Sequence, residues 1–156
     1  MLSINTPAPL DTTAVGPDGK SISLRSQLGH YTVLYFYPKD DTPGCTKEAC
    51  SFRDAEVAMQ KLGITVIGVS PDGISSHQKF QKKYSFSFPL WSDPEHKLAE
   101  AFGAWGEKKF MGKTYQGILR STFVLDPEGK IVVVWPKVQP TEHATEVLAF
   151  LKTVIS

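Results

Sequence analysis

The sequence predicts an α/β fold, with helices packed around a central sheet, on the basis of three observations. Residues 31–37 are almost continuously apolar and rich in β-branched and aromatic side chains, which is typical of a strand buried on both faces. Residues 64–70 form a second run of this kind. Residues 43–62 are predicted to form a helix, because Pro43 suits a first helical turn and Gly63 suits a helix end. This alternation of strand and helix indicates α/β layering.

The remaining elements follow from turn signals and periodicity. Residues 1–20 look irregular, because they contain prolines and a Gly-Pro-Asp-Gly turn. Residues 103–117 are rich in glycine, lysine and aromatic residues without a clean period, so we expect a loop with one short strand at most. The other predicted elements are a short strand at 21–24, helices at 74–84, 93–102 and 141–154, and a β-hairpin formed by 120–125 and 130–135.

The composition is that of an ordinary globular protein. A length of 156 residues fits one domain, residues 1–156, with one core. The net charge of +1 leaves no basic excess to neutralise phosphates, so we expect no nucleic-acid partner. The N-terminus lacks a positive segment followed by an apolar run, and no apolar run reaches membrane-spanning length. We therefore expect a cytosolic monomer without a membrane partner.

Cys45 and Cys50 are the two cysteines of the chain. Structural disulfides are rare in the cytosol, so reduced thiols, metal ligands or a redox pair are the options. Cys45 lies in the first turn of the predicted helix, where free N–H groups and the helix dipole favour the thiolate. It also follows a buried strand at the carboxyl edge of the sheet, where α/β folds bind ligands. We therefore predict that Cys45 is a partly exposed nucleophile.

The spacing of the two cysteines has a structural consequence. On an intact helix, residues five apart lie about 140° around the axis from each other, with Cα atoms roughly 8–9 Å apart. A disulfide needs less than about 7 Å between Cα atoms. A bond between Cys45 and Cys50 therefore requires the first turns of the helix to unwind.

Other interpretations of the pair stay open on spacing alone. Free cysteines are often simply buried. A zinc site is disfavoured because the four histidines show no ligand-like spacing to the pair, and a plain dithiol reductase because the spacing is not Cys-x-x-Cys. A redox-sensing or interaction protein, switched by a Cys45–Cys50 disulfide, is the alternative function. The histidines are His30, His77, His96 and His143.

The motif around Cys45 resembles the peroxiredoxins. Pro38, Thr42 and Cys45 match the Pro-x-x-x-Thr-x-x-Cys signature of that family. Cys50 matches the Q-type subgroup, also called bacterioferritin comigratory protein, and Arg120 matches the active-site arginine of the family. Further similarity runs through residues 67–70, 88–90, 102–108 and 123–126, so the resemblance covers nearly the whole chain.

The resemblance implies a thioredoxin-like fold with a central mixed sheet flanked by helices. It implies that Cys45 reacts with hydrogen peroxide or organic hydroperoxides to give a sulfenic acid, and that Cys50 resolves it as an intramolecular disulfide. Thioredoxin or a similar dithiol protein would restore both thiols. No metal, haem or flavin would be needed.

Three more residues are candidates for the site, and each has an ordinary alternative. The Thr42 hydroxyl can donate to a peroxide oxygen, or merely cap the helix. Arg120 can contact thiolate and substrate together, although an arginine at a strand start is usually solvated. Pro38 can shield the pocket, or simply end a strand. Asp40 and Asp41 are interpreted as loop carboxylates and left out, because negative charge would oppose the thiolate.

Overall fold

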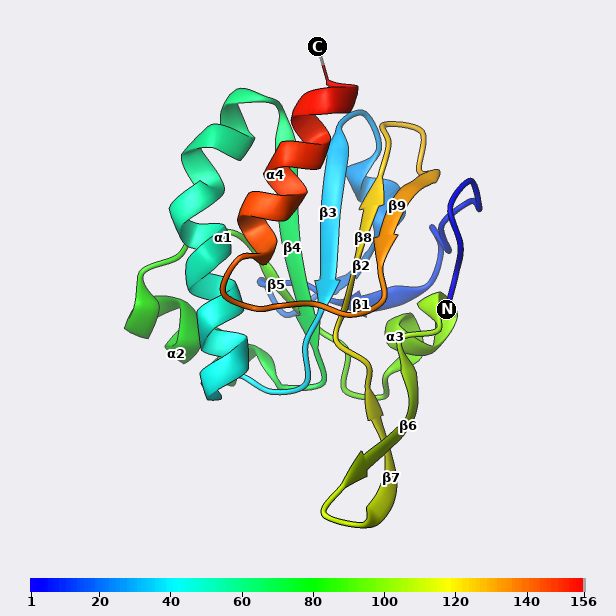
Figure 1. Cartoon of the computed structure of the whole chain (residues 1–156), viewed down its shortest axis with the longest axis vertical. Helices are drawn as coiled ribbons and strands as arrows, with labels where there is room; N and C mark the ends of the chain where they lie inside the picture. The colour runs from blue at the N-terminus through cyan, green and yellow to red at the C-terminus, as the bar shows by residue number, and fades with distance from the viewer. Residues whose placement is uncertain (156) are drawn as a thin grey trace.

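Seven strands form one mixed sheet in the computed structural model, which describes residues 1–155 (Figure 1). In order across the sheet, they are β2 (Ser21–Ser23), β1 (Thr13–Val15), β5 (Leu90–Ser92), β4 (Ile64–Ser70), β3 (Tyr31–Phe36), β8 (Ser121–Leu125) and β9 (Ile131–Trp135). The central strands β3, β4 and β5 are parallel, whereas β8, β9 and β1 are antiparallel to their neighbours. The predicted central mixed sheet is therefore confirmed.

Helices cover both faces of this sheet (Figure 1). One face packs against α1 (Pro43–Lys61), α2 (Ile74–Tyr84) and α4 (His143–Val154), and the other against α3 (Lys97–Phe102), with the 3₁₀ helix η1 (Leu24–Gln27) preceding β3. The side chains of β3 alternate between the two cores: Val33 and Tyr35 lie in the first, Leu34 and Phe36 in the second. This alternation explains the unbroken apolar run, because both faces of the strand are buried.

Two strands of the sheet were missed by the sequence-based predictions, and one helix begins later than expected. β1 lies within residues 1–20, which were expected to be irregular, and β5 was not predicted. Both strands have only three residues, which is too short for a periodic signal. The helix predicted at 93–102 begins at Lys97, because Asp93 lies before it and accepts N–H bonds from Leu98 (3.1 Å) and Ala99 (2.9 Å).

The loop expected at residues 103–117 is also wrong. It is a two-stranded antiparallel ribbon of β6 (Trp105–Phe110) and β7 (Lys113–Ile118), which extends away from the main sheet (Figure 1). Met111 and Gly112 have φ angles of 51° and 78°, which suit a tight hairpin turn. Most of the ribbon is exposed, so no buried face imposes an alternating pattern on its sequence.

The other predicted elements are confirmed, with shifts of one or two residues at some ends. Gly63 has a φ of 73°, the left-handed conformation expected of a glycine just after a helix. Among residues 1–155, no helix has the length and apolar character needed to cross a membrane.

Candidate active site

The site begins where the chain leaves β3 and enters α1. Thr42 occupies the predicted N-cap position with an extended backbone, and Pro43 follows in the first turn. The Thr42 hydroxyl, however, makes no capping bond and donates instead to the Lys39 carbonyl at 3.0 Å. This contact closes the loop upon itself just before the helix and leaves the first N–H groups of α1 free of a side-chain cap.

Cys45 lies on the core-facing side of α1. It shares that side with Ala49, Phe52 and Met59, all of which are buried. The Cys45 residue is only 1% exposed, which is less than expected. The reason is that distant segments cover the first turn: a Cβ atom at Gly44 would lie 3.4 Å from the Arg120 Nη2 atom.

Arg120 links this turn to the sheet. Its Nη2 group donates to the Cys45 Sγ atom at 3.0 Å, and its Nη1 group donates to the Glu48 Oε1 atom at 2.7 Å. The side chain is 21% exposed, so the alternative of a solvated arginine is not what the fold shows. Burial alone would lower the pKa of Arg120, but the Glu48 carboxylate and the Cys45 sulfur outweigh burial and raise it.

Glu48 is the residue of this site that the sequence analysis missed. Its side chain is completely buried, and its Oε2 atom has no hydrogen-bond partner within residues 1–155. Burial raises the pKa of Glu48 to about 7, although Arg120 acts in the opposite direction. The signal that could have found it is its position three residues after Cys45, which places both on one face of the helix.

Cys50 lies further along the same helix and is half-buried. Both cysteines are free thiols, and α1 is continuous from Pro43 to Lys61. The structure therefore represents the reduced protein with its helix intact. β3 ends at Phe36, two residues before Pro38, which is also half-buried and lies within the same loop.

Asp40 lies in the loop between β3 and α1, as expected, but it is buried. Its side chain is 3% exposed, and three side chains donate to it or share a proton with it: Tyr37, Ser76 and His77. Asp41 does remain half-exposed and accepts bonds from Lys83 and Tyr84.

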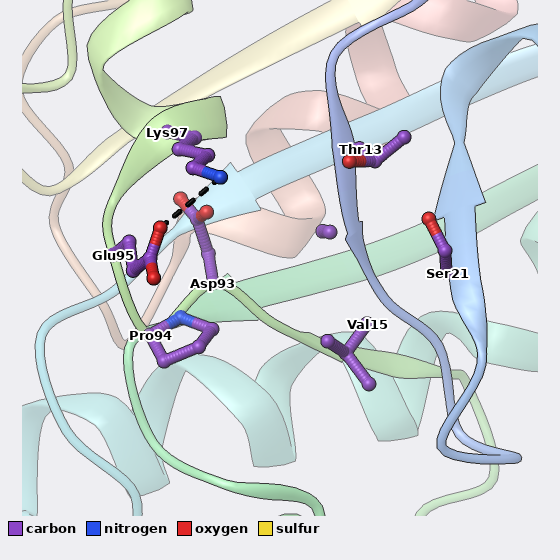
Figure 2. Close-up of a pocket in the computed structure, with 8 residues that line it drawn as sticks. Thr13, Val15, Ser21, Asp93, Pro94, Glu95 and Lys97 are labelled. Atoms are coloured by element: carbon purple, nitrogen blue, oxygen red, sulfur yellow. Dashed lines mark ion pairs between the residues drawn. The ribbon is translucent and has the colours of Figure 1, made fainter.

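One cavity of about 430 Å³ is lined by Asp40, Asp41 and side chains of α2, and others lie elsewhere on the molecule. Figure 2 shows one of about 240 Å³, between β1, β2 and the segment before α3. Its ion pair, Lys97 to Glu95 at 3.1 Å, is largely exposed to solvent. Within residues 1–155, no three His, Cys, Asp or Glu side chains cluster as metal ligands do. The side chains best placed to carry out chemistry are therefore those around Cys45.

Comparison with known proteins places this arrangement in a family. A model of the AhpC/TSA family matches residues 4–134. Peroxiredoxin Bcp of Bacillus subtilis is 48% identical over 97% of this chain and 96% of its own length. Peroxiredoxin Bcp of Escherichia coli is 43% identical over 86% of each chain.

Solved structures agree with this assignment. The bacterioferritin comigratory protein of Xanthomonas campestris, studied for alkyl peroxide reduction, has a TM-score of 0.87 at 41% identity, covering 96% of this chain and 99% of that one. A cysteine-to-serine mutant of Xylella fastidiosa PrxQ has a TM-score of 0.93 at 34% identity, covering 100% and 99%. These likenesses confirm the predicted thioredoxin-like fold. The chain therefore belongs to the AhpC/TSA family, within which it is a Q-type peroxiredoxin and hence a thiol-dependent peroxidase.

Proposed function

We propose that this peroxiredoxin reduces hydrogen peroxide and organic hydroperoxides, with Cys45 as the peroxidatic cysteine and Cys50 as the resolving cysteine. The observation that carries this assignment is the 3.0 Å bond from Arg120 to the Cys45 sulfur, at the start of a helix. A fixed cation and free helix N–H groups both stabilise a thiolate, which is the nucleophilic form.

The first step oxidises Cys45. Its thiolate attacks one oxygen of the peroxide, so that an S–O bond forms while the O–O bond breaks. Sulfur becomes a sulfenic acid, and the departing oxygen takes a proton to leave as water or an alcohol. Negative charge moves onto the departing oxygen, and the Arg120 guanidinium is a preorganised donor beside it.

Supporting residues hold this arrangement in place. Glu48 accepts from Nη1 of Arg120, which leaves Nη2 directed at the sulfur. We therefore assign Glu48 as a positioning residue for the arginine. Thr42 donates to the Lys39 carbonyl before substrate arrives, and its hydroxyl rotates to donate to a peroxide oxygen when substrate is bound. Pro38 has no backbone N–H donor, and its ring excludes water from this side of the loop.

The second step forms the disulfide. The Cys50 sulfur attacks the sulfenic sulfur, so that an S–S bond forms, the S–O bond breaks and water leaves. Because the intact helix keeps the two cysteines too far apart, the first turns of α1 unwind for this step. Unwinding also removes Cys45 from Arg120, so activation and resolution need different conformations.

The third step regenerates the enzyme by exchange with a dithiol protein. We propose thioredoxin or a similar protein as that partner, and a monomer in the cytosol as the working form. The near-neutral net charge of +1 supports the absence of a nucleic-acid partner. The alkyl peroxide reduction studied in the Xanthomonas campestris relative supports the inclusion of organic hydroperoxides.

The test is steady-state consumption of peroxide with thioredoxin, thioredoxin reductase and NADPH. We expect Cys45→Ser to abolish turnover. Cys50→Ser is the matched control: it should still consume one equivalent of peroxide and form a sulfenic acid, but no disulfide. Turnover retained by Cys45→Ser would refute the assignment. A wild-type protein oxidised only once per chain would instead favour the redox-sensing alternative.

A further inference from the structure

A buried polar network lies beneath the loop that precedes Cys45. Asp40 is at its centre: the Tyr37 hydroxyl donates to Oδ1 at 2.5 Å, and the Ser76 hydroxyl donates to Oδ2 at 2.7 Å. The His77 Nδ1 atom lies 2.7 Å from the same Oδ2. Asp40 belongs to the catalytic loop, whereas Ser76 and His77 belong to α2. The network therefore fastens that loop to a neighbouring helix.

The partners of His77 determine its protonation. Its Nε2 atom lies 3.1 Å from the Trp91 carbonyl oxygen, which can only accept a hydrogen bond. Its Nδ1 atom faces the Asp40 carboxylate, which already accepts from two hydroxyl groups. Both ring nitrogens therefore need a proton, and the imidazolium form of His77 satisfies both contacts. His77 and Asp40 are 2% and 3% exposed, so this is a buried ion pair.

The backbone of Asp40 is held as firmly as its side chain. Its N–H group donates to the Asp72 Oδ2 atom at 2.6 Å. The Asp72 carbonyl in turn accepts from the Ser92 hydroxyl at 2.6 Å, at the end of β5. Asp40 is thus bound both to α2 and to the segment that follows β4. Five residues later the chain reaches Cys45, so the position of this anchor determines where α1 begins.

We propose that Asp40 and His77 are positioning residues, whose buried ion pair holds the first turn of α1 wound and thereby limits the rate of disulfide formation. The proposal rests on the peroxidase cycle proposed above. In that cycle, peroxide reacts with the wound form and Cys50 reaches Cys45 only in the unwound form. A contact that favours the wound form therefore lengthens the lifetime of the sulfenic acid.

The neighbouring residue supplies a matched control. Asp41 also joins the loop to α2, through Lys83 at 2.8 Å and Tyr84 at 2.6 Å, but its side chain is 40% exposed. Its φ of 56° is tolerated by asparagine as well as by aspartate. Asp41→Asn and Asp40→Asn are thus the same change at adjacent positions, one at the exposed contact and one at the buried ion pair.

The experiment is single-turnover oxidation with hydrogen peroxide, in which Cys45 oxidation and disulfide formation are timed separately by rapid quench, alkylation and mass spectrometry. Asp40→Asn keeps a neutral hydrogen bond to His77, so we expect it to fold. Charge-assisted bonds are about twice as strong as neutral ones, so disulfide formation should accelerate about 5- to 10-fold. The wound form remains the major one, so Cys45 oxidation should change less than about twofold. Asp41→Asn should alter both steps less than about twofold.

Two results would overturn the proposal. An unchanged rate of disulfide formation in Asp40→Asn would show that the pair is equally intact in both forms, since only a differential interaction shifts a population. Equal acceleration in Asp40→Asn and Asp41→Asn would show that the ion pair has no special part. If the role of Asp40 were purely structural, Asp40→Asn would lower thermal stability but would change the rates of Cys45 oxidation and disulfide formation by the same factor.

The protonation of His77 is tested independently of activity. Nitrogen-15 NMR of the reduced wild-type protein should show a proton on both ring nitrogens of His77, and Asp40→Asn should show one, on Nε2. A single ring proton in the wild type would refute the ion pair. This measurement distinguishes failure of the proposal from failure of the peroxidase assignment, because the latter is decided by turnover of wild type against Cys45→Ser.

Discussion

Two buried acid–base pairs flank Cys45, and they differ in how completely their polar atoms are partnered. In the pair after the cysteine, Arg120 binds both Glu48 and the reactive sulfur, while the second Glu48 oxygen has no partner within residues 1–155. In the pair before it, both oxygens of Asp40 accept hydrogen bonds and both nitrogens of His77 face acceptors. The Glu48–Arg120 pair has an oxygen atom without a partner, whereas every carboxylate oxygen and ring nitrogen of the Asp40–His77 pair has one.

This difference matches the roles proposed for the two pairs. An incompletely partnered pair can respond when charge appears or leaves nearby, and the Glu48 pKa, raised by burial to about 7, allows it to do so near neutral pH. A pair in which every polar atom has a partner instead holds its segments of the chain rigid. In the proposed cycle, the Asp40–His77 pair before Cys45 in the sequence provides rigidity, and the Glu48–Arg120 pair after it responds to changes of charge.

The largest effect should come from breaking the rigid pair. His77→Leu leaves Asp40 buried without its cation, which costs about 3–5 kcal/mol of folding free energy. Urea unfolding measures this loss. The matched control is His143→Leu: burial lowers the pKa of His143, so that its loss leaves no buried charge unpaired, and the cost should be about 1–3 kcal/mol. Equal losses would remove the distinction between the two histidines.

The pH dependence of stability should report the reactive pair. Between the ordinary pKa of 4.5 and the folded pKa of about 7, the folded protein keeps a proton on Glu48 that the unfolded chain releases. Folding therefore becomes less favourable as pH rises through this window. A change of one pKa unit is worth about 1.4 kcal/mol, so the rise of the Glu48 pKa from 4.5 to about 7 corresponds to a loss of about 3 kcal/mol in the free energy of unfolding. Urea unfolding at both ends of the window should show this loss in wild type and its absence in Glu48→Gln.

A smaller effect on free energy is expected from replacing Arg120, which bonds to both Glu48 and the Cys45 sulfur. Lysine has one ammonium group and cannot reproduce the two directed bonds of Arg120. We expect Arg120→Lys to slow Cys45 oxidation about 100-fold, which corresponds to about 2.7 kcal/mol. Stopped-flow measurement of the second-order rate with hydrogen peroxide tests this. A rate within threefold of wild type would mean that a positive charge alone, without the two directed donors of the guanidinium, is sufficient for fast oxidation of Cys45.

The smallest effect should come from the exposed contact of Asp41. Lys83→Met removes an ammonium group that lies 2.8 Å from the Asp41 carboxylate, with both side chains substantially exposed. Solvent screens such pairs, so we expect both rates of the cycle to stay within about twofold of wild type. The same single-turnover assay measures them. A larger change would show that the loop is anchored at its surface as well as in its interior.

The sequence predicted the regular elements with strong signals and missed those without them. The runs that became β3 and β4 were clear, because strands buried on both faces must be apolar throughout. The ribbon of β6 and β7 was not predicted, because most of it is exposed and no buried face imposes an alternating pattern of apolar residues. The short strands β1 and β5 owe their pairing to neighbours far away in the chain, which no local pattern reveals.

The sequence by itself determined that Cys45, the proposed nucleophile, lies at the start of a helix. A cysteine just after Thr-Pro-Gly, between a buried strand and a helix, lies at a helix start wherever that helix packs. What only the tertiary structure decided is what surrounds it. Arg120 reaches Cys45 across 75 residues, and His77 reaches Asp40 across 37. The physical reason is that helix starts depend on adjacent residues, whereas the burial of Glu48 and the pairing of Asp40 depend on how separate elements pack.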